Sequence, residues 1–233
     1  VSLFTNDVQV LHVTGLRGDV FVPCESGDRA ILWRSSKSLP CQRIPNKGFK
    51  VRLTAWPLDN LPDYQVTDLA APWQTRWYAS LDELPEGGLT NRIYRTEKLL
   101  MRKIAARGVP FRMGCGDEYP FRASRQVKDG LRTITLSDDY YIGVYELTQG
   151  QYVNGVQRSN PSKFRADNAE WTTWVAEDEH DRCDERPLEN RSYNAFHGSG
   201  DEVGADSDLA ILRANTQIAF DLPTEAQWEF AAR

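Results

Sequence analysis

Two short sequences of the form Thr-x-x-Gln constrain this chain most, because each marks the start of a helix. In such a capping box the threonine side chain accepts a hydrogen bond from the backbone three residues on, and the glutamine side chain reaches back to the threonine N–H. The pattern occurs at residues 148–151 and again at residues 224–227, directly after Pro223. Apolar residues follow each box at helical spacing: Tyr152, Val153 and Val156 after the first, and Trp228, Ala231 and Ala232 after the second. We predict two short helices that pack these residues inward.

Residues 1–80 have the pattern of short strands separated by turns. Residues 49–55 alternate apolar and polar side chains, which predicts a strand with one buried face. Apolar, β-branched or aromatic runs at 8–13, 19–22 and 30–34 are separated by glycine- and proline-containing stretches. The prolines of residues 56–62 argue against a strand there. We therefore predict a small all-β, sandwich-like domain.

The rest of the chain mixes strands, helices and long loops. Strands are predicted at residues 99–104 and 133–136, and the aromatic run at 140–145 predicts a buried strand. A third helix is predicted at 207–216, where Leu209 and Leu212 lie three residues apart. Residues 165–210 hold 13 acidic and 4 basic residues, and we expect this segment to form a long surface loop.

Charge and hydropathy exclude some classes of function. The formal net charge of −5 argues against a nucleic-acid-binding protein, which needs a basic surface. No apolar run approaches the roughly 18 residues of a membrane helix, so we expect no membrane span. The first residues lack the pattern of a signal peptide. Because the chain does not begin with Met, removal of such a peptide stays compatible with the sequence.

The chain has four cysteines, and no two of them have the Cys-x-x-Cys spacing of a zinc or thioredoxin-like motif. Cys24 and Cys41 are close enough in sequence to form a disulfide in an exported protein, and equally compatible with two core thiols in a reducing compartment. Cys115 and Cys183 have no better claim to pairing.

Five motifs follow one another over about 135 residues. They are residues 99–114 (LLMRKIAARGVPFRMG), 139–152 (DYYIGVYELTQGQY), 160–164 (NPSKF), 186–190 (RPLEN) and 222–233 (LPTEAQWEFAAR). Their identity and order resemble the formylglycine-generating enzyme, or sulfatase-modifying factor, family. The lead-in segments 77–85 and 93–99, and Asp221 before the last motif, are similar to a bacterial subgroup that joins an N-terminal β-domain to this module.

The resemblance implies an α+β fold, an irregular module related to the C-type lectin-like fold. We expect a β-sandwich-like domain at residues 1–80, a linker at 81–98, and the N-terminal portion of the family module at 99–233. Buried aromatic residues stabilise such modules, and four candidates for the core are Trp228, Tyr141, Tyr145 and Tyr152.

The resemblance also implies an activity. Authentic members of the family oxidise a sulfatase cysteine to formylglycine with copper(I), molecular oxygen and a pair of cysteines. Copper, and also calcium, are the cofactors expected in a complete active member. The family's cysteine pair lies beyond the helix in which this chain stops. We therefore assign no catalytic, cofactor-binding or metal-binding residue here, and expect the chain alone to be inactive.

Three groups of reactive residues have both a site and a structural interpretation. Cys115 is predicted to be a structural thiol, since no base is placed beside it by the sequence. Residues 179–185 contain every common metal-ligand type, yet a solvated polar loop also contains them. Residues 201–208 offer oxygen ligands for calcium, but lack EF-hand spacing. The structural alternative there is helix capping by Ser207 or Asp206.

Two further pairs remain. Glu225 and Glu229 lie four apart, as a paired-carboxylate site requires, although Glu225 in a first helical turn is explained by the helix dipole. Trp171 and Trp174 interrupt an acidic segment. They are expected either to fill the module's own core or to form a binding surface, and we favour the core.

Three functional hypotheses follow. The first is the N-terminal portion of a formylglycine-generating oxidase, with a sulfatase polypeptide as partner. The second is a non-catalytic, C-type-lectin-like binding module of an exported protein, with another protein or a glycan as ligand. The third, a non-haem iron sulfoxide synthase, ranks last, because three scattered histidines (His12, His180 and His197) give no evidence of its ligand domain. Relatives with an added β-domain are often exported, which favours a periplasmic or secreted location.

Overall fold

The computed structural model describes residues 2–5, 8–12, 16–18, 27–34, 49–53, 55–57, 60–71, 73–114, 130–168, 170 and 182–233. In this part of the chain, helices and antiparallel strands are mixed, as the α+β prediction requires. None of the helices in the described ranges has the length and apolar character that crossing a bilayer requires.

Five short strands form near the N-terminus. Strand β1 (Ser2–Thr5) lies between β2 (Val8–His12) and β5 (Phe49–Arg52) in one antiparallel sheet. Strands β3 (Leu16–Gly18) and β4 (Ile31–Trp33) pair in a second. The strands predicted at 8–13, 30–34 and 49–55 are confirmed, although each is shorter than its pattern. The strand predicted at 19–22 lies outside the described residues.

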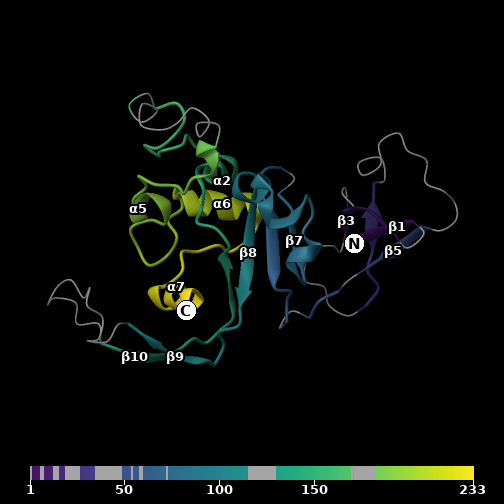
Figure 1. Cartoon of the computed structure of the whole chain (residues 1–233), viewed down its shortest axis with the longest axis horizontal. Coiled ribbons are helices and arrows are strands. Elements are labelled where there is room, and N and C mark those ends of the chain that lie inside the picture. Colours follow the sequence, from purple (N-terminus) through teal and green to yellow (C-terminus); the bar gives the residue numbers. More distant parts are fainter. Residues whose placement is uncertain are drawn as a thin grey trace.

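A four-stranded antiparallel sheet forms the centre of the remaining chain, in the order β11, β8, β6, β7 (Figure 1). Its strands are β6 (Tyr64–Asp68), β7 (Thr75–Tyr78), β8 (Lys98–Ile104) and β11 (Tyr140–Gly143). Strand β6 pairs with β7 on one side and with β8 on the other. The predicted division into 1–80, 81–98 and 99–233 stays a prediction, but one sheet joins residues on both sides of the 81–98 segment.

The segment between β7 and β8 contains three short 3-10 helices: η1 (Leu81–Glu83), η2 (Gly88–Thr90) and η3 (Arg92–Arg95). Beyond β8, strands β9 (Pro110–Met113) and β10 (Arg132–Thr135) pair with each other as a separate two-stranded sheet. The strands predicted at 99–104, 133–136 and 140–145 are therefore confirmed. However, β11 is an edge strand and only partly buried, because β8 covers one side of it alone.

The predicted helices all form. Helix α2 (Gln149–Val156) and helix α7 (Glu225–Ala232) each begin with a complete capping box, and α6 (Asp208–Thr216) is capped by Ser207. Two shorter elements, η4 (Cys183–Glu185) and α5 (Tyr193–Phe196), lie between α2 and α6. Both capping-box predictions are confirmed. They could be made from the sequence because every hydrogen bond of a capping box forms within four residues.

Both faces of the central sheet are covered. Leu99 packs with Tyr152, Leu209 and Leu212 from α2 and α6, whereas its neighbour Leu100 belongs to a second buried cluster. That second cluster also contains Val66, Tyr78, Leu84 and Tyr94. Successive residues of a strand point to opposite faces, so β8 contributes to both clusters. Helices α2 and α6 approach so closely that a Cβ on Gly155 would lie 2.9 Å from Leu212 Cδ1.

The prediction that Trp228 points inward is wrong. The Trp228 side chain is 61% exposed, and α7 has no buried residue. The helix instead contacts β9 through Phe230, whose ring makes a T-shaped contact with the ring of Phe111 at a centroid distance of 5.0 Å. Among the other predicted core aromatics, Tyr152 is 1% exposed, whereas Tyr141 and Tyr145 are only partly buried. Val153, predicted to face inward with Tyr152, is 41% exposed.

Candidate functional site

The most deeply buried charge in the described residues is Asp208, the first residue of α6. Its side chain is 0% exposed, and two arginines neutralise it. Arg191 binds both carboxylate oxygens, with Nη2 lying 2.8 Å from Oδ1 and Nε contacting Oδ2. Arg158 contacts Oδ1 through Nη1. A buried carboxylate needs such paired and hydrogen-bonded partners, because its desolvation is costly.

A tyrosine completes this buried group, which we call the Asp208 cluster: Tyr152, Arg158, Arg191 and Asp208. The Tyr152 hydroxyl donates a hydrogen bond to Asp208 Oδ2 at 3.2 Å. Burial raises the pKa of Tyr152, and the negative charge of Asp208 raises it further. The hydrogen bonds to Asp208 raise the pKa of Arg191. The cluster is thus an arrangement of two fixed guanidinium groups around one carboxylate.

The Asp208 cluster lies beside an open depression of about 460 Å³. Arg158 and Arg191 line it, as do Asn194, Ser199 and Asp206. The side chains of Arg158 and Arg191 are 38% and 25% exposed, so part of each guanidinium faces solvent. The depression thus combines a concave surface with two charged groups that are held in place by Asp208.

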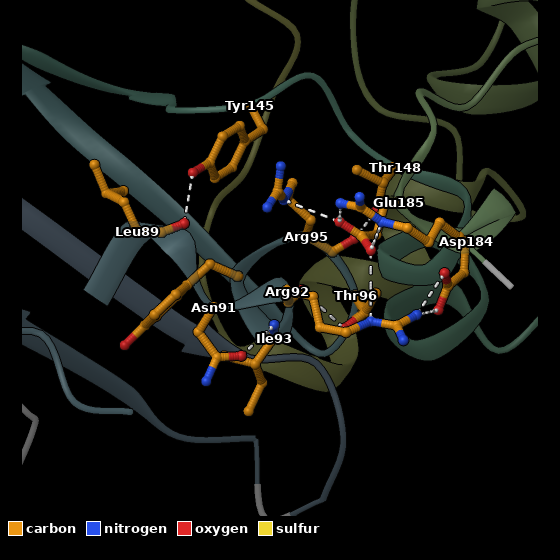
Figure 2. Close-up of polar contacts among 12 residues, drawn as sticks. Leu89, Asn91, Arg92, Ile93, Arg95, Thr96, Tyr145, Thr148, Asp184 and Glu185 are labelled. Atoms are coloured by element: carbon orange, nitrogen blue, oxygen red, sulfur yellow. Dashed lines mark hydrogen bonds and ion pairs between the residues drawn. The ribbon is translucent and has the colours of Figure 1, made fainter. Parts of the chain in front are cut away.

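A second charged group joins η3 to η4, and Figure 2 shows its geometry. Arg92 Nη2 lies 2.9 Å from Asp184 Oδ1, and Arg95 Nε lies 3.3 Å from Glu185 Oε2. Arg182 donates to both carboxylate oxygens of Glu185, at 2.9 and 3.1 Å. These hydrogen bonds from Arg182, followed by the charges of Arg182, Arg95 and Arg92, hold the pKa of Glu185 below its usual range although burial opposes this.

The structural role of this second group is to connect distant parts of the chain. The Arg95 guanidinium lies over the Tyr145 ring at 5.3 Å from its centroid, and Figure 2 shows it between that ring and Glu185. The Thr148 hydroxyl donates to the Arg95 carbonyl, which ties the capping box of α2 to η3. Every carboxylate of the group is already paired with arginine, which leaves none to bind a metal.

The structure describes residues 182–185 of the segment 179–185, and there the carboxylates bind arginines and not a metal. Residues 179–181 lie outside the described residues. Cys183 is 3% exposed, and Asp184 and Glu185 are occupied by arginines. Across the described ranges, no group of three or more His, Cys, Asp or Glu side chains is placed to hold a metal ion.

The helix-capping interpretation of residues 201–208 is confirmed for Ser207. The Ser207 hydroxyl accepts a hydrogen bond from the Ala210 N–H at 3.1 Å. Asp208 binds arginine, so its carboxylate is not available as a calcium ligand. Asp206 caps nothing with its side chain; its carbonyl accepts a hydrogen bond from Arg158 Nη2 at 2.9 Å.

Glu225 and Glu229 do not form a paired-carboxylate site. Glu225 is exposed in the first turn of α7, where the helix dipole favours a negative charge. Glu229 accepts hydrogen bonds from the Gly114 N–H at 2.9 and 3.2 Å and pairs with Arg233. The two glutamates therefore have separate structural roles. The remaining candidates, Cys115, Trp171 and Trp174, lie outside the described residues, as do Cys24 and Cys41.

The five sequence motifs contact one another. Gln149 donates from its backbone to the Arg186 carbonyl at 2.9 Å and from its side chain to the Phe164 carbonyl at 3.1 Å. The Phe164 N–H donates to Glu189 Oε1 at 2.9 Å. Motifs 139–152, 160–164 and 186–190 thus form one hydrogen-bonded unit. The contact of Gly114 with Glu229 likewise joins motif 99–114 to motif 222–233.

Copper does not fit the described residues. Copper(I) selects soft thiolate ligands, and Cys183 is the one cysteine in the described ranges. Its neighbours Asp184 and Glu185 are bound to arginines, and the described residues contain no group of three or more His, Cys, Asp or Glu side chains placed to hold a metal ion. We derive no catalytic step through copper at these residues.

No local sequence pattern indicates the two arginine groups. Arg158 and Asp208 are 50 positions apart, and Arg92 and Asp184 are 92 apart, so no local spacing links them. Arg191 and Asp208 are only 17 positions apart, but an acidic loop separates them, so no helical or strand periodicity relates the two residues. Only the fold reveals these pairs.

Comparison with known proteins agrees with the motifs. The model of the sulfatase-modifying factor enzyme 1-like domain matches residues 95–233, which include all five motifs. Neither the curated proteins nor the solved structures yielded a significant match. Because the family model covers more than half of the chain, this protein belongs to the family of the sulfatase-modifying factor enzyme 1-like domain.

Proposed function

We propose that the protein serves in the conversion of a sulfatase cysteine to formylglycine, with residues 95–233 as scaffold of the oxidase module. The observation that carries this proposal is the family match over all five motifs. The partner would be a sulfatase polypeptide. As in other members of the family, copper would be the cofactor and molecular oxygen would be consumed. The lectin-like detail of the fold and a periplasmic or secreted location belong to the same proposal.

The contacts among the motifs support a scaffolding role. Polar side chains of the motifs, such as Gln149, Glu189 and Glu229, form hydrogen bonds that hold loops and helix ends together. A polar group that makes such bonds in the interior rigidifies a fold with little regular structure. The residues that match the family in this chain thus build the module, and none of them is assigned a step of the reaction.

Turnover would depend on ligands outside the described residues. The described part holds the single buried thiol of Cys183 and no cluster of metal-ligand side chains. A thiol that is buried from solvent is far less reactive than an exposed thiolate. We propose, as the family resemblance implies, that these 233 residues alone do not form formylglycine.

The test compares the natural full-length protein with the 233-residue chain on one peptide carrying the sulfatase motif Cys-x-Pro-x-Arg. Both are supplied with copper(I), oxygen and a thiol reductant, and aldehyde formation is followed by mass spectrometry together with oxygen uptake. We expect aldehyde from the full-length protein and none from the chain. Aldehyde formation by the chain would contradict its proposed inactivity, and none from either would contradict the oxidase.

The second candidate is a non-catalytic binding module of an exported protein. The observation that favours it is the poor fit of copper to the described residues. In that case the full-length protein would bind a protein or glycan ligand without oxygen uptake. The same assay separates the two, because only an oxidase consumes oxygen in proportion to the aldehyde formed.

A further inference from the structure

The depression beside the Asp208 cluster has no role in the proposed oxidation. It has a volume of about 460 Å³, and two arginine side chains line it. The lining also includes the polar side chains of Asn194 and Ser199. A concave surface with a few convergent polar groups is the usual form of a small-molecule site.

The two arginines that line the depression keep N–H donors that no described residue accepts. A guanidinium has five N–H donors. Arg191 makes three hydrogen bonds to described residues, two to Asp208 and one to the Ala195 carbonyl, all through Nε and Nη2. Arg158 makes two, to Asp208 and to the Asp206 carbonyl. Five of the ten N–H groups, including both on Arg191 Nη1, therefore have no partner in the described part of the chain.

The two guanidinium groups are held in place before any ligand arrives. Asp208 is fully buried beneath them and accepts hydrogen bonds from both, so neither arginine is free to change its position without exposing that carboxylate. The loop behind the depression is also tightly closed. A Cβ on Gly198, which has a φ of +114°, would lie 2.7 Å from the Gly204 nitrogen. Such preorganisation reduces the entropy lost on binding.

The charges select the class of ligand. The N–H donors that remain call for an oxyanion, and a planar carboxylate matches the planar guanidinium. Asp206 lines the same depression, so with Asp208 the two arginines are formally balanced. The depression therefore carries no excess positive charge, and the repulsion from Asp206 grows with each negative charge on the ligand, which favours a monoanion over a dianion. We propose that the depression binds the carboxylate group of a small monoanionic ligand through Arg158 and Arg191.

The proposal predicts a saturable response to acetate, the smallest probe of this class. In nuclear magnetic resonance spectra of the chain, acetate at constant ionic strength should shift the Nε–H signals of Arg158 and Arg191, with a dissociation constant on the order of millimolar. Inorganic phosphate should bind no more tightly. Absence of a saturable shift would overturn the proposal, and phosphate binding tenfold more tightly than acetate would overturn the choice of a monoanion.

Two exposed residues allow the site to be altered without touching the Asp208 cluster. Ser199→Glu places a carboxylate in the lining and should weaken acetate binding at least about tenfold. Its matched control is Thr133→Glu on exposed strand β10, which should leave binding unchanged. Asp206→Asn removes the competing charge and should strengthen binding severalfold. Equal affinity in all three variants would show that acetate binds elsewhere and would overturn the proposal.

Discussion

The hydroxyl of Tyr152 donates a hydrogen bond to Oδ2 of Asp208 at a distance of 3.2 Å, which joins helix α2 to the first turn of helix α6. Both side chains are buried, with exposed fractions of 1% and 0%. The same two helices also approach each other closely at Gly155 and Leu212. The arginines that neutralise Asp208 come from segments after α2 and before α5, so one carboxylate connects four parts of the domain.

Substitution of Asp208 should therefore destabilise the fold more than substitution of Tyr152. Tyr152→Phe removes one hydrogen bond and should lower the free energy of unfolding by about 1 kcal/mol. Asp208→Asn leaves two arginines without their counter-charge and should lower it by about 3–5 kcal/mol. Urea denaturation followed by fluorescence measures both. The exposed Asp201 in the preceding loop is the control, since Asp201→Asn should change the value by less than about 0.5 kcal/mol.

Helix α7 should depend on Glu229 and hardly on Glu225. Glu229→Gln weakens the hydrogen bonds from the Gly114 N–H and the ion pair with Arg233, and should lower the free energy of unfolding by about 1 kcal/mol. Glu225→Gln loses a dipole interaction of only a few tenths of a kcal/mol, roughly. Amide hydrogen exchange at Gly114 gives a local reading: it should speed up in the first variant alone. Equal exchange rates in the two variants would contradict the assignment.

Trp228 and Phe230 provide a test of how α7 is oriented. Trp228 is 61% exposed, so Trp228→Ser should change the free energy of unfolding by less than about 0.5 kcal/mol. The rings of Phe230 and Phe111 form a T-shaped pair, so Phe230→Ala should cost about 1–2 kcal/mol. If Trp228→Ser proves the more costly change, the helix is rotated so that Trp228 faces inward.

The two capping boxes should differ in strength although their sequences are alike. Thr148 is 2% exposed, and its hydroxyl also donates to the Arg95 carbonyl, whereas Thr224 is exposed. Thr148→Ala should therefore cost about 2 kcal/mol, and Thr224→Ala about 1 kcal/mol or less. Thermal unfolding followed by circular dichroism compares them. Restoring the hydroxyl with Thr148→Ser should recover most of the loss, which separates the cap from the packing of the threonine methyl group.

The helix starts could be predicted because their signals are local. Each capping box closes within four residues. Leu209 and Leu212 of α6 face the hydrophobic core, as their spacing indicates. The orientation of α7 could not be predicted in this way. An aromatic side chain in a short helix packs against whatever the fold places beside it, and β9 presents Phe111 to Phe230 and not to Trp228.

The ion pairs of the two arginine groups could not be predicted from the sequence for a related reason. The sequence predicts a solvated loop at residues 179–185 and a helix cap within residues 201–208, and each segment contains a carboxylate that the fold buries among arginines. The arginine partners lie up to 92 positions away, and acidic composition alone does not reveal which carboxylate is buried. The partial burial of β11 has a similar cause, since an aromatic strand at a sheet edge has the same composition as one at the centre.

Stability should depend on pH through Glu185. Hydrogen bonds from Arg182, and then the charges of Arg182, Arg95 and Arg92, lower the pKa of Glu185 from its ordinary value of 4.5 in the folded protein. The unfolded chain binds the proton more readily, so the stabilisation is complete above pH 4.5 and is lost as the pH falls through the folded-state pKa. Glu185→Gln should lower the free energy of unfolding by about 2 kcal/mol at pH 7.

The difference between wild type and Glu185→Gln should then shrink as the pH falls below about 4.5 and vanish once Glu185 is protonated. Urea denaturation at a series of pH values between neutral and strongly acidic measures this directly. Glu202 is exposed, so Glu202→Gln should follow the wild-type profile throughout and serves as the control. A difference between wild type and Glu185→Gln that stays constant with pH would show that Glu185 stabilises the η3–η4 contact by shape and neutral hydrogen bonding, and that its charge contributes nothing.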